Sequence, residues 1–306
     1  MNSPDVQETL TVWQLGDGKP GHENQSLGLI EAIGRVRACE HHRIDISDAR
    51  NFWSRWKSAR KQAEALPPAD LIIGAGHATH FALWCLRRFS GAKTVLLMKP
   101  SLPMGFFDLC IAPRHDFPTG FVDGENLLLT DGAINRVVVG EGERSGKLIL
   151  LGGPSKNHGW DAEGMMKSLG ELAKEGDWQL TDSRRTPEGF VDRIRTELPQ
   201  IRIHPHTETG PDWLPQVLQQ VEEVWVSEDS VSMTYEALSS GAKVGLLPVP
   251  REREEARVLR GLDRLLKKQQ LTTLSTWLES SRQLDEAKPL READRCADLL
   301  LDRLSL

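Results

Sequence analysis

The sequence predicts an α/β protein made of two doubly wound domains, each with a parallel sheet covered by helices. Three observations support this prediction. Short apolar runs alternate with amphipathic segments in both halves of the chain, as they do in βαβ units. A glycine-containing loop follows the first apolar run of each half, at Leu15–Leu29 and at Leu150–Trp160. A charged, glycine-containing stretch at Asn135–Gly146 separates the halves, as a linker would.

In the first half, apolar β-branched and leucine-rich runs predict strands, and segments of helical period predict helices. The expected strands are Leu10–Leu15, His42–Ile46, Leu71–Ile73, Thr94–Met98, Leu109–Ala112 and Leu127–Leu129. The expected helices are Asn24–Val36, Trp53–Ala65 and Thr79–Phe89. Because helices follow strands, we expect parallel pairing.

The second half repeats the pattern. The expected strands are Lys147–Leu151, Trp178–Thr181, Ile201–His204, Val224–Val226 and Val244–Leu247. The expected helices are Ala162–Glu175, Pro187–Leu198, a helix from the Ser227–Ser230 turn to Ser240, and a charged helix at Arg253–Lys268. Gly241 stands where a left-handed helix cap is favoured.

The last segment, Pro289–Leu306, has apolar residues at helical spacing and could pack back on the first domain. We therefore expect an N-terminal domain at residues 1–140, a C-terminal domain at 141–288, and a C-terminal helix at 289–306.

The composition of the chain excludes several classes of function. The chain has 306 residues, 39% of them hydrophobic, and a net charge of −6, which argues against nucleic acid as the main partner. Its four cysteines are scattered without a CxxC pair, so we expect reduced thiols and no structural zinc. The N-terminus lacks the pattern of a signal peptide, and no apolar run is long enough to span a bilayer, so we expect a cytoplasmic protein.

The loop "LGDGKPGHENQSLGL" connects the first strand to the first helix. Its glycines permit a close approach of backbone to a ligand. His22 could act as a general base on a hydroxyl group, and Asp17 could orient it or take that role itself. The alternative is a plain strand-to-helix turn in which His22 is a polar cap. The loop matches neither GxGxxG nor the P-loop, so it predicts neither NAD nor ATP.

The loop "LLGGPSKNHGW" opens the second half. Gly152, Gly153, Ser155 and Lys156 make a small-residue loop with one cation, which suits a diphosphate. A plain glycine turn with an exposed lysine is the alternative.

The motif "TDSRRTPEG" follows the next strand. Arg184 and Arg185 suit bidentate contact with phosphate, and Ser183 and Thr186 can cap a helix that Pro187 starts. The alternative is a solvated arginine pair beside a structural cap.

The strand–turn–helix unit "EVWVSEDSVSMTYEALSSGAKVGLLP" is the most informative part of the chain. A helix that starts after a strand presents free N–H groups and a positive dipole end to anions. Ser230, Ser232 and Met233 would lie at this helix start. Glu236 shares their face and could accept hydrogen bonds from a pair of sugar hydroxyls, so the unit suits a nucleotide sugar.

Two further motifs, "GAGHATH" and "LMKPSLPMGFFDLCIAPRHD", put polar residues after strands of the first half. His77 and His80 are three residues apart, but no carboxylate stands at matching spacing, so we expect no metal site. Lys99, Arg114 and His115 could bind a charged acceptor, although a salt-bridge cluster explains them equally well.

Together, the motifs "DGKPGHENQSLGL", "GAGHATH", "KPSLP", "PRHD", "LLGGPSK", "SRRTP" and "SEDSVSMTYEALSSG" resemble those of bacterial members of the mitochondrial-fission Elm-like family. That family is treated as glycosyltransferases of the GT-B architecture. The first loop and Glu236 are also distantly similar to the histidine-ending loop and the ribose-binding glutamate of the peptidoglycan glycosyltransferase MurG. Met233 and Tyr235 depart from the small residues that precede the glutamate there, so the sugar and the base stay open.

The resemblance implies two Rossmann-like domains that face each other across a cleft, with the acceptor on the first and the donor nucleotide on the second. The implied catalytic residues are His22 and Asp17. The implied acceptor-side residues are Gly18, Asn24, His77, Lys99, Arg114 and His115. The implied donor-binding residues are Gly152, Gly153, Ser155, Lys156, Ser183, Arg184, Arg185, Ser230, Ser232, Met233 and Glu236.

These features predict a metal-independent, inverting glycosyltransferase. It would move a sugar from a UDP-sugar to an envelope or lipid-linked saccharide, with the nucleotide sugar as co-substrate and no other cofactor. Such an acceptor would place the protein at the inner face of the membrane. The basic stretch Arg253–Lys268 could touch a membrane surface, although a solvated helix face explains it better.

Two other functions stay open. A UDP-sugar 2-epimerase or hydrolase of the same architecture would use similar side chains without an acceptor. A non-enzymatic binding or scaffold protein would bind no nucleotide sugar.

Overall fold

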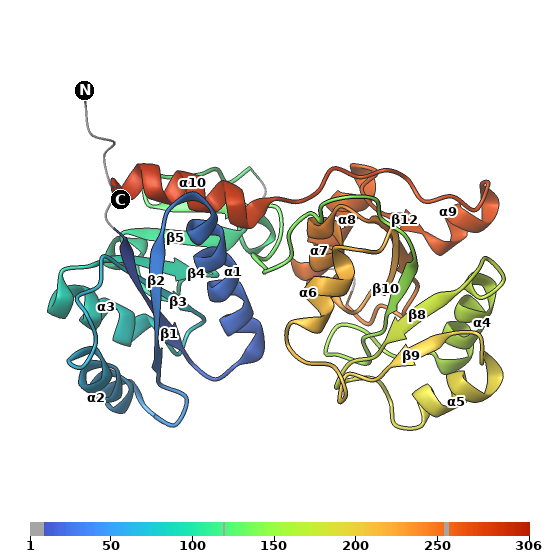
Figure 1. Ribbon diagram of the computed structural model, residues 1–306, viewed down its shortest axis with the longest axis horizontal. Helices are drawn as coiled ribbons and strands as arrows, with labels where there is room; N and C mark the ends of the chain where they lie inside the picture. The colour runs from blue at the N-terminus through green and yellow to red at the C-terminus, as the bar shows by residue number, and fades with distance from the viewer. Residues whose placement is uncertain (1–8, 119, 254–256) are drawn as a thin grey trace. The chain divides into compact units, whose positions relative to one another are not determined.

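The computed structural model describes residues 9–118, 120–253 and 257–306, and it divides into two compact units. Unit 1 contains residues up to Arg136 together with Arg291–Leu306 at the end of the chain. Unit 2 is the continuous segment Val137–Leu290. Each unit has one sheet with helices on its faces (Figure 1). In the described residues every neighbouring pair of strands is parallel, which confirms the predicted α/β class with two doubly wound sheets.

The sheet of unit 1 has the strand order β2-β1-β3-β4-β5-β6. Its strands are β1 (Leu10–Gly16), β2 (Cys39–Asp45), β3 (Leu71–Ala75), β4 (Lys93–Leu97), β5 (Leu109–Pro113) and β6 (Leu127–Thr130). In the register of this sheet, Val12 of β1 pairs with His41 of β2 on one side and with Leu71 of β3 on the other. The central strands are buried on both faces, which is why they are continuous apolar runs in the sequence.

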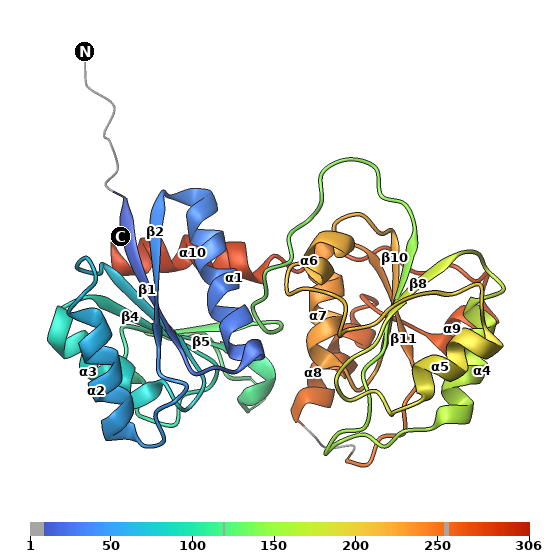
Figure 2. The same cartoon turned by 60° about the horizontal axis from the view of Figure 1, so that its bottom comes forward.

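Helices cover both faces of this sheet, α1 and α10 on one and α2 and α3 on the other (Figure 2). Their bounds are α1 (Pro20–Val36), α2 (Phe52–Ala63), α3 (His80–Ser90) and α10 (Glu292–Leu304), with 3-10 turns η1 (Met104–Phe106) and η2 (Arg114–Asp116). Side chains alternate between the two cores along each strand: Ile73 belongs to the α1 and α10 core, and Ile72 to the α2 and α3 core.

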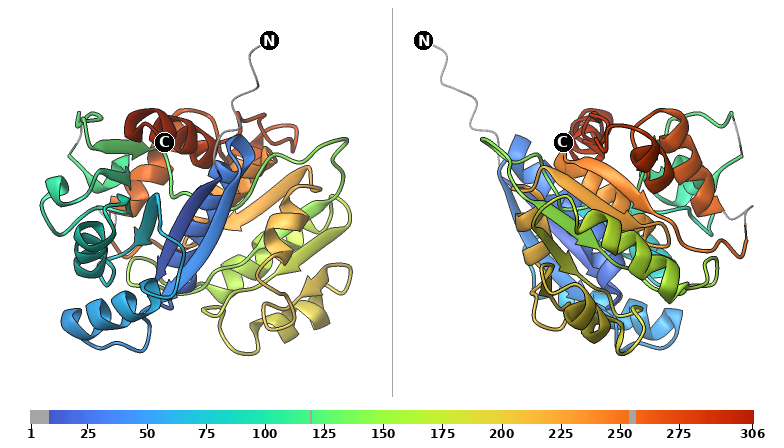
Figure 3. Two further views of the ribbon diagram at one scale, coloured as in Figure 1. Left: turned by 60° about the vertical axis from the view of Figure 1, so that its left-hand side comes forward. Right: turned by 90° about the vertical axis from the view of Figure 1, so that its right-hand side faces the viewer.

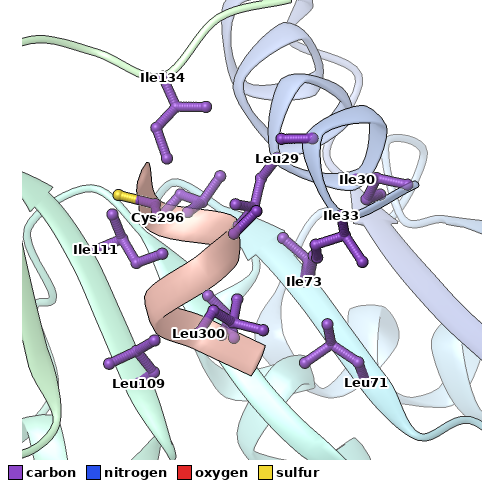
Figure 4. Close-up of a cluster of buried hydrophobic side chains, with 14 of the residues drawn as sticks. Leu29, Ile30, Ile33, Leu71, Ile73, Leu109, Ile111, Ile134, Cys296 and Leu300 are labelled. Carbon is purple, nitrogen blue, oxygen red and sulfur yellow. The ribbon is translucent and has the colours of Figure 1, made fainter. Parts of the chain in front are cut away.

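Helix α10 completes unit 1 from the far end of the sequence. Cys296 and Leu300 are fully buried among Leu29, Ile33 and strand residues such as Ile111, as Figure 4 shows. The sequence left open where this segment docks, because helical spacing defines an apolar face but not the surface that covers it.

The sheet of unit 2 has the order β12-β11-β10-β7-β8-β9. Its strands are β7 (Lys147–Leu150), β8 (Trp178–Thr181), β9 (Arg202–His204), β10 (Glu223–Ser227), β11 (Lys243–Leu247) and β12 (Thr272–Thr273). Helices α4, α5 and α9 cover one face, with α4 and α5 side by side in Figure 3, and α6, α7 and α8 cover the other. The helices are α4 (Ala162–Leu172), α5 (Phe190–Glu197), α6 (Trp213–Leu218), α7 (Val231–Ser240), α8 (Arg257–Lys267) and α9 (Leu274–Glu279).

The main differences from the sequence-based expectations concern α1, α5, β12 and α9, and β2 begins at Cys39, three residues before the expected start. Helix α1 begins at Pro20 and not at Asn24, because Pro20 occupies the first helical position that proline favours. Helix α5 begins at Phe190 behind Gly189, so neither Ser183 nor Thr186 caps it. Strand β12 and helix α9 were not predicted.

Residues 254–256 of the expected helix Arg253–Lys268 lie outside the described residues, and the rest forms α8. No described helix combines the length and apolar character needed to cross a bilayer.

We expect Leu300→Ala to destabilise the protein by about 2–5 kcal/mol, because it removes a fully buried side chain from a core built by segments far apart in sequence. Asp298→Ala is the matched control: it lies on the exposed side of the same helix, and we expect it to change stability by about 0.5 kcal/mol or less. Urea unfolding of both variants measures the difference. Equal midpoints would show that α10 contributes little to the fold.

Candidate functional site

The strand orders identify one topological switch point at the carboxyl edge of each sheet, between the two strands from which the chain winds in opposite directions. In unit 1 the chain winds outward in opposite directions from β1 and β3, and in unit 2 from β7 and β10. The loops that leave such a pair of strands separate, and ligands of doubly wound proteins bind in the gap between them. Two loops flank each gap: those after β1 and β3 in unit 1, and those after β7 and β10 in unit 2.

An Asp–His pair stands at the switch point of unit 1. Asp17 directly follows β1, and its side chain is only 2% exposed. Its Oδ2 lies 2.9 Å from Nδ1 of His22, in the first turn of α1, and its Oδ1 accepts from the backbone N–H of Lys19 at 3.2 Å. With Nδ1–H donated to Asp17, Nε2 of the neutral ring is an acceptor.

Gly76, in the loop after β3, fixes the other side of the His22 ring. Its φ is +81°, and a Cβ at this position would lie 2.2 Å from Cε1 of His22. The chain therefore needs glycine here both for the left-handed backbone and for the space that the imidazole fills. The two loops of the switch point thus meet at His22, one through a hydrogen bond and one through ring contact.

The other residues predicted for the acceptor side are placed at the same edge but are largely engaged with the chain itself. Lys99 donates to the carbonyl of Asp116 at 2.9 Å, and Arg114 donates to the carbonyl of Phe121 at 3.3 Å. His77 is exposed in the loop after β3. Gly18 packs over Ser47. Asn24 is half-buried on α1, and His115 lies in η2.

The glycine loop of unit 2 is held by the loops beside it. The N–H of Gly152 donates to Oγ of Ser227 at 2.7 Å, and the N–H of Gly153 donates to Oδ2 of Asp229 at 2.8 Å. A Cβ on Gly152 would lie 2.0 Å from that carboxylate, and one on Gly153 would lie 1.9 Å from the carbonyl oxygen of Arg185. The two glycines are thus required by the packing of the chain against itself, where the sequence suggested room for a ligand.

Asp229 also pairs with one of the two predicted arginines. Nη2 of Arg185 lies 2.8 Å from Oδ2 of Asp229, whose side chain is 0% exposed. Arg185 also donates to the carbonyl of Gly153 at 2.5 Å. Arg184 is exposed, and within the described ranges it has no ion-pair partner. The adjacent arginines therefore differ in role: Arg185 closes the loop, and Arg184 is available to an anion.

Two of the four serines predicted to hold the donor, Ser155 and Ser183, serve partly in local turns. Oγ of Ser155 accepts from the N–H groups of Asn157 and His158, both at 3.2 Å, which leaves its own O–H free to donate. Oγ of Ser183 accepts from the N–H of Arg185 at 3.2 Å. Lys156 is exposed and, among the described side chains, has no ion-pair partner.

Helix α7 presents its start and one face at this edge. Ser230 is its N-cap, but the Ser230 side chain makes no capping hydrogen bond, so the first-turn N–H groups keep their capacity for an anion. Ser232 is exposed, and Met233 and Glu236 are half-buried on the same face, whereas Thr234 and Tyr235 between them are buried. Gly241 ends the helix at φ +78°, as predicted.

Sequence reasoning missed two polar groups at this edge. Asp229 is one. The other is the pair Asp182 and His206, in which the carboxylate accepts from the backbone N–H of His206 at 2.7 Å and lies 2.9 Å from its Nδ1. His158, which the glycine loop offers as a further contact for a diphosphate, is instead 1% exposed and has no hydrogen-bond partner for either ring nitrogen within the described residues; burial lowers its pKa. The only signal was an acid just after a predicted strand, at Asp182 and at Asp229.

A pocket of about 500 Å³ lies elsewhere in unit 2. Its walls come from α4, α9, Leu246 and Leu266, and its lining includes the ion pair between Glu228 and Arg251 but none of the predicted donor-binding residues. Across the described part of the chain, no group of three or more histidine, cysteine, aspartate or glutamate side chains is arranged to hold a metal ion.

Comparison with known proteins identifies the family. Residues 20–304 match the family model described as "Mitochondrial fission ELM1". The chain belongs to this family. A curated relative, the uncharacterized protein RP120 of Rickettsia prowazekii, is 27% identical in an alignment of 116 residues that covers 35% of this chain. The match spans about a third of that relative's length, 33%.

Three solved structures share the fold of this ELM1-family chain. The UDP-GlcNAc 2-epimerase of Methanocaldococcus jannaschii is 10% identical with a TM-score of 0.57, covering 96% of this chain and 100% of its own. The Staphylococcus aureus MnaA–UDP structure is 14% identical with a TM-score of 0.52, covering 98% of both chains. Acinetobacter baumannii MurG is 12% identical with a TM-score of 0.52, covering 96% of this chain and 99% of its own. At these identities the likeness concerns the fold, and it confirms the predicted GT-B-like class.

We expect Arg185→Ala to destabilise the protein by about 2–3 kcal/mol, because it leaves the buried carboxylate of Asp229 without its cation. The cost is below that for a fully buried pair because the Arg185 side chain is 39% exposed. Arg184→Ala, the neighbouring exposed arginine, should change stability by about 0.5 kcal/mol or less. Equal urea midpoints for the two variants would contradict this assignment.

His80 gives unit 1 a pH-dependent stability. Its ring is 3% exposed, with Nδ1 2.8 Å from Oγ of Ser101; burial, and then the neighbouring His77, lower its pKa from 6.5 to about 4. As pH falls from 6.5 towards 4, the unfolded chain takes up this proton before the folded one does. Stability present above pH 6.5 is therefore lost over this window, by at most about 1.4 kcal/mol per pH unit.

We expect His80→Asn to flatten this dependence in urea unfolding curves recorded from pH 7 to pH 4. His77→Asn, which changes the exposed neighbour, should keep most of the wild-type slope. Parallel curves for wild type and His80→Asn would show that another group is responsible.

Proposed function

We propose that this chain is a glycosyltransferase that moves a sugar from a UDP-sugar to a saccharide hydroxyl without a metal ion. The observation that carries the proposal is the Asp17–His22 pair at the switch point of unit 1, held by Gly76 so that Nε2 is left to act as a base. An imidazole that is fixed in this way at the carboxyl edge of a parallel sheet is suited to take the proton from the hydroxyl group of a bound acceptor.

In the proposed reaction, Nε2 of His22 takes the proton of the acceptor hydroxyl. The oxygen forms a bond to the anomeric carbon while the bond from that carbon to the β-phosphate oxygen breaks, and the electron pair leaves with UDP. A single displacement of this kind inverts the anomeric configuration. Asp17 holds the ring in the reactive tautomer and stabilises the imidazolium that forms.

Unit 2 supplies what the leaving diphosphate needs. The first-turn N–H groups of α7, the exposed Lys156 and the O–H of Ser155 belong to the two loops at its switch point, and the exposed Arg184 follows β8, the next strand beside β7. Fixed dipoles and cations of this kind stabilise developing negative charge in place of a metal ion. Glu236, two turns into α7, would accept hydrogen bonds from the ribose hydroxyls. UDP is favoured because MnaA, which shares the fold, was solved together with UDP, and the M. jannaschii protein is a UDP-GlcNAc 2-epimerase.

A second candidate is a UDP-sugar 2-epimerase or hydrolase. The fold likeness to the M. jannaschii 2-epimerase supports it, as does the second Asp–His pair, Asp182 and His206, in unit 2. This reaction requires no acceptor, so free UDP or an epimer would form from the UDP-sugar alone.

The first test is thermal unfolding with UDP and UDP-sugars in EDTA. We expect UDP to raise the melting temperature of wild type by mass action, and Glu236→Ala to lose most of this shift. Glu279→Ala, an exposed glutamate at the end of α9, is the matched control and should keep the shift. No shift with any nucleoside diphosphate would contradict the proposal.

His22→Asn separates chemistry from donor binding. We expect it to keep the UDP shift and to lower sugar transfer about 10²–10⁴-fold, because general-base catalysis is lost while unit 2 is unchanged. Product analysis with and without saccharide acceptors measures the rate. UDP release that needs no acceptor would favour the epimerase or hydrolase.

A further inference from the structure

Five aromatic rings form a connected cluster on the surface of unit 1. They are Phe52 and Trp53 from α2, Phe81 and Trp84 from α3, and Phe106 from η1, and we call them the aromatic patch. Consecutive ring centroids lie 5.2 to 5.9 Å apart, from Phe52 through Phe81 and Trp84 to Phe106, and the last two rings are stacked at 25°. Trp53 closes the group at 5.3 Å from Phe81.

The aromatic patch is not part of the core. Phe52 is 51% exposed, Trp53 57% and Phe106 37%, although the same two helices bury other residues, such as Ala59 and Leu83, against the sheet. Scattered exposed apolar residues are ordinary on a soluble protein, but a contiguous group of large rings marks an interaction site.

The two helices that carry most of the aromatic patch are rich in basic residues. Residues 50–93, which contain α2 and α3, hold eight lysines and arginines and two acidic residues, in a chain whose net charge is −6. Lys57 and Lys61 are exposed on α2, and the guanidinium of Arg88 lies 5.9 Å from the Trp84 ring. Arg60 and Arg87 are paired with Glu64 and Asp108. Lys57, Lys61 and Arg88 still leave these helices with an excess of positive charge, so a partner that is both negative and apolar fits this surface.

One end of the aromatic patch stands at the same edge of the sheet as the proposed base. Helices α2 and α3 both begin at the carboxyl edge of the sheet, because each follows a parallel strand. Phe81 is the second residue of α3, five positions after Gly76, on which the His22 ring rests.

We propose that the aromatic patch docks on the surface of an anionic lipid bilayer. Tryptophan and phenylalanine rings settle at the level of the lipid headgroups, and lysine and arginine beside them are attracted by anionic lipids. The match of rings and positive charge on one face fits a bilayer better than it fits a purely acidic or a purely apolar protein surface. Docking in this way brings the switch point of unit 1 towards acceptors held at the membrane.

The proposal goes beyond the proposed function and does not depend on it, because binding to vesicles needs no substrate. Co-sedimentation of the full chain with phosphatidylcholine vesicles, with and without phosphatidylglycerol, measures it. We expect binding to rise with the anionic lipid and to fall as salt is raised.

Two matched pairs of variants locate the contact. Trp53→Ser should lower the partition coefficient on anionic vesicles about tenfold, whereas Phe121→Ser, an exposed ring outside the aromatic patch, should leave it unchanged. Lys57→Gln should lower it about fivefold, whereas Lys267→Gln, an exposed lysine of α8, should leave it unchanged. Melting temperatures confirm that all four variants fold.

Wild-type protein that stays in the supernatant with every vesicle would overturn the proposal and assign the aromatic patch to a protein partner. Equal losses for Lys57→Gln and Lys267→Gln would overturn it too, because binding would then follow overall charge and not this surface. Loss of vesicle binding in Trp53→Ser with an intact UDP shift would support it and leave the proposed function untouched.

Discussion

The buried carboxylate of Asp229 holds together the three loops on which the candidate donor site depends. It stands after β10, accepts from the backbone after β7, and pairs with an arginine after β8. An ionised carboxylate in the interior is unfavourable unless such donors surround it. The three loops are therefore confined to conformations that supply these hydrogen-bond donors. Lys156 and Arg184, whose side chains are exposed, are the cations that remain at this edge of the sheet.

The fold could be predicted because most of its strands are visible in the sequence as short, continuous apolar runs. Runs such as Leu148–Leu151 and Val224–Val226 are buried on both faces, and a continuous apolar run shows this directly. Strand β12 could not be predicted, because Thr272–Thr273 carries no apolar pattern and is a strand only through pairing with Gly245 and Leu246. The sequence predicts too late a start for α1, because Pro20 and Gly21 are residue types typical of loops.

The candidate site was predictable to the extent that its residues are neighbours in sequence. Asp17 and His22 meet at 2.9 Å within one loop. The contact of His22 with Gly76 and the pairing of Asp182 with His206 join separate βαβ units, so no local pattern contains them. Arg184 and Arg185 are chemically identical neighbours, and only the position of Asp229 decides which of them is neutralised.

Unit 1 is built from both ends of the chain, and this has a consequence for how the protein is made. Leu29 and Leu300 share one core, whereas unit 2 is one uninterrupted segment. During synthesis, unit 2 can fold as soon as residue 290 has emerged. Unit 1 is incomplete until α10 has also emerged, because only α1 covers that face of its sheet before then. A chain that stops before α10 would therefore carry a finished second unit and a first unit that exposes leucine and isoleucine side chains, such as Leu29 and Ile111, to solvent.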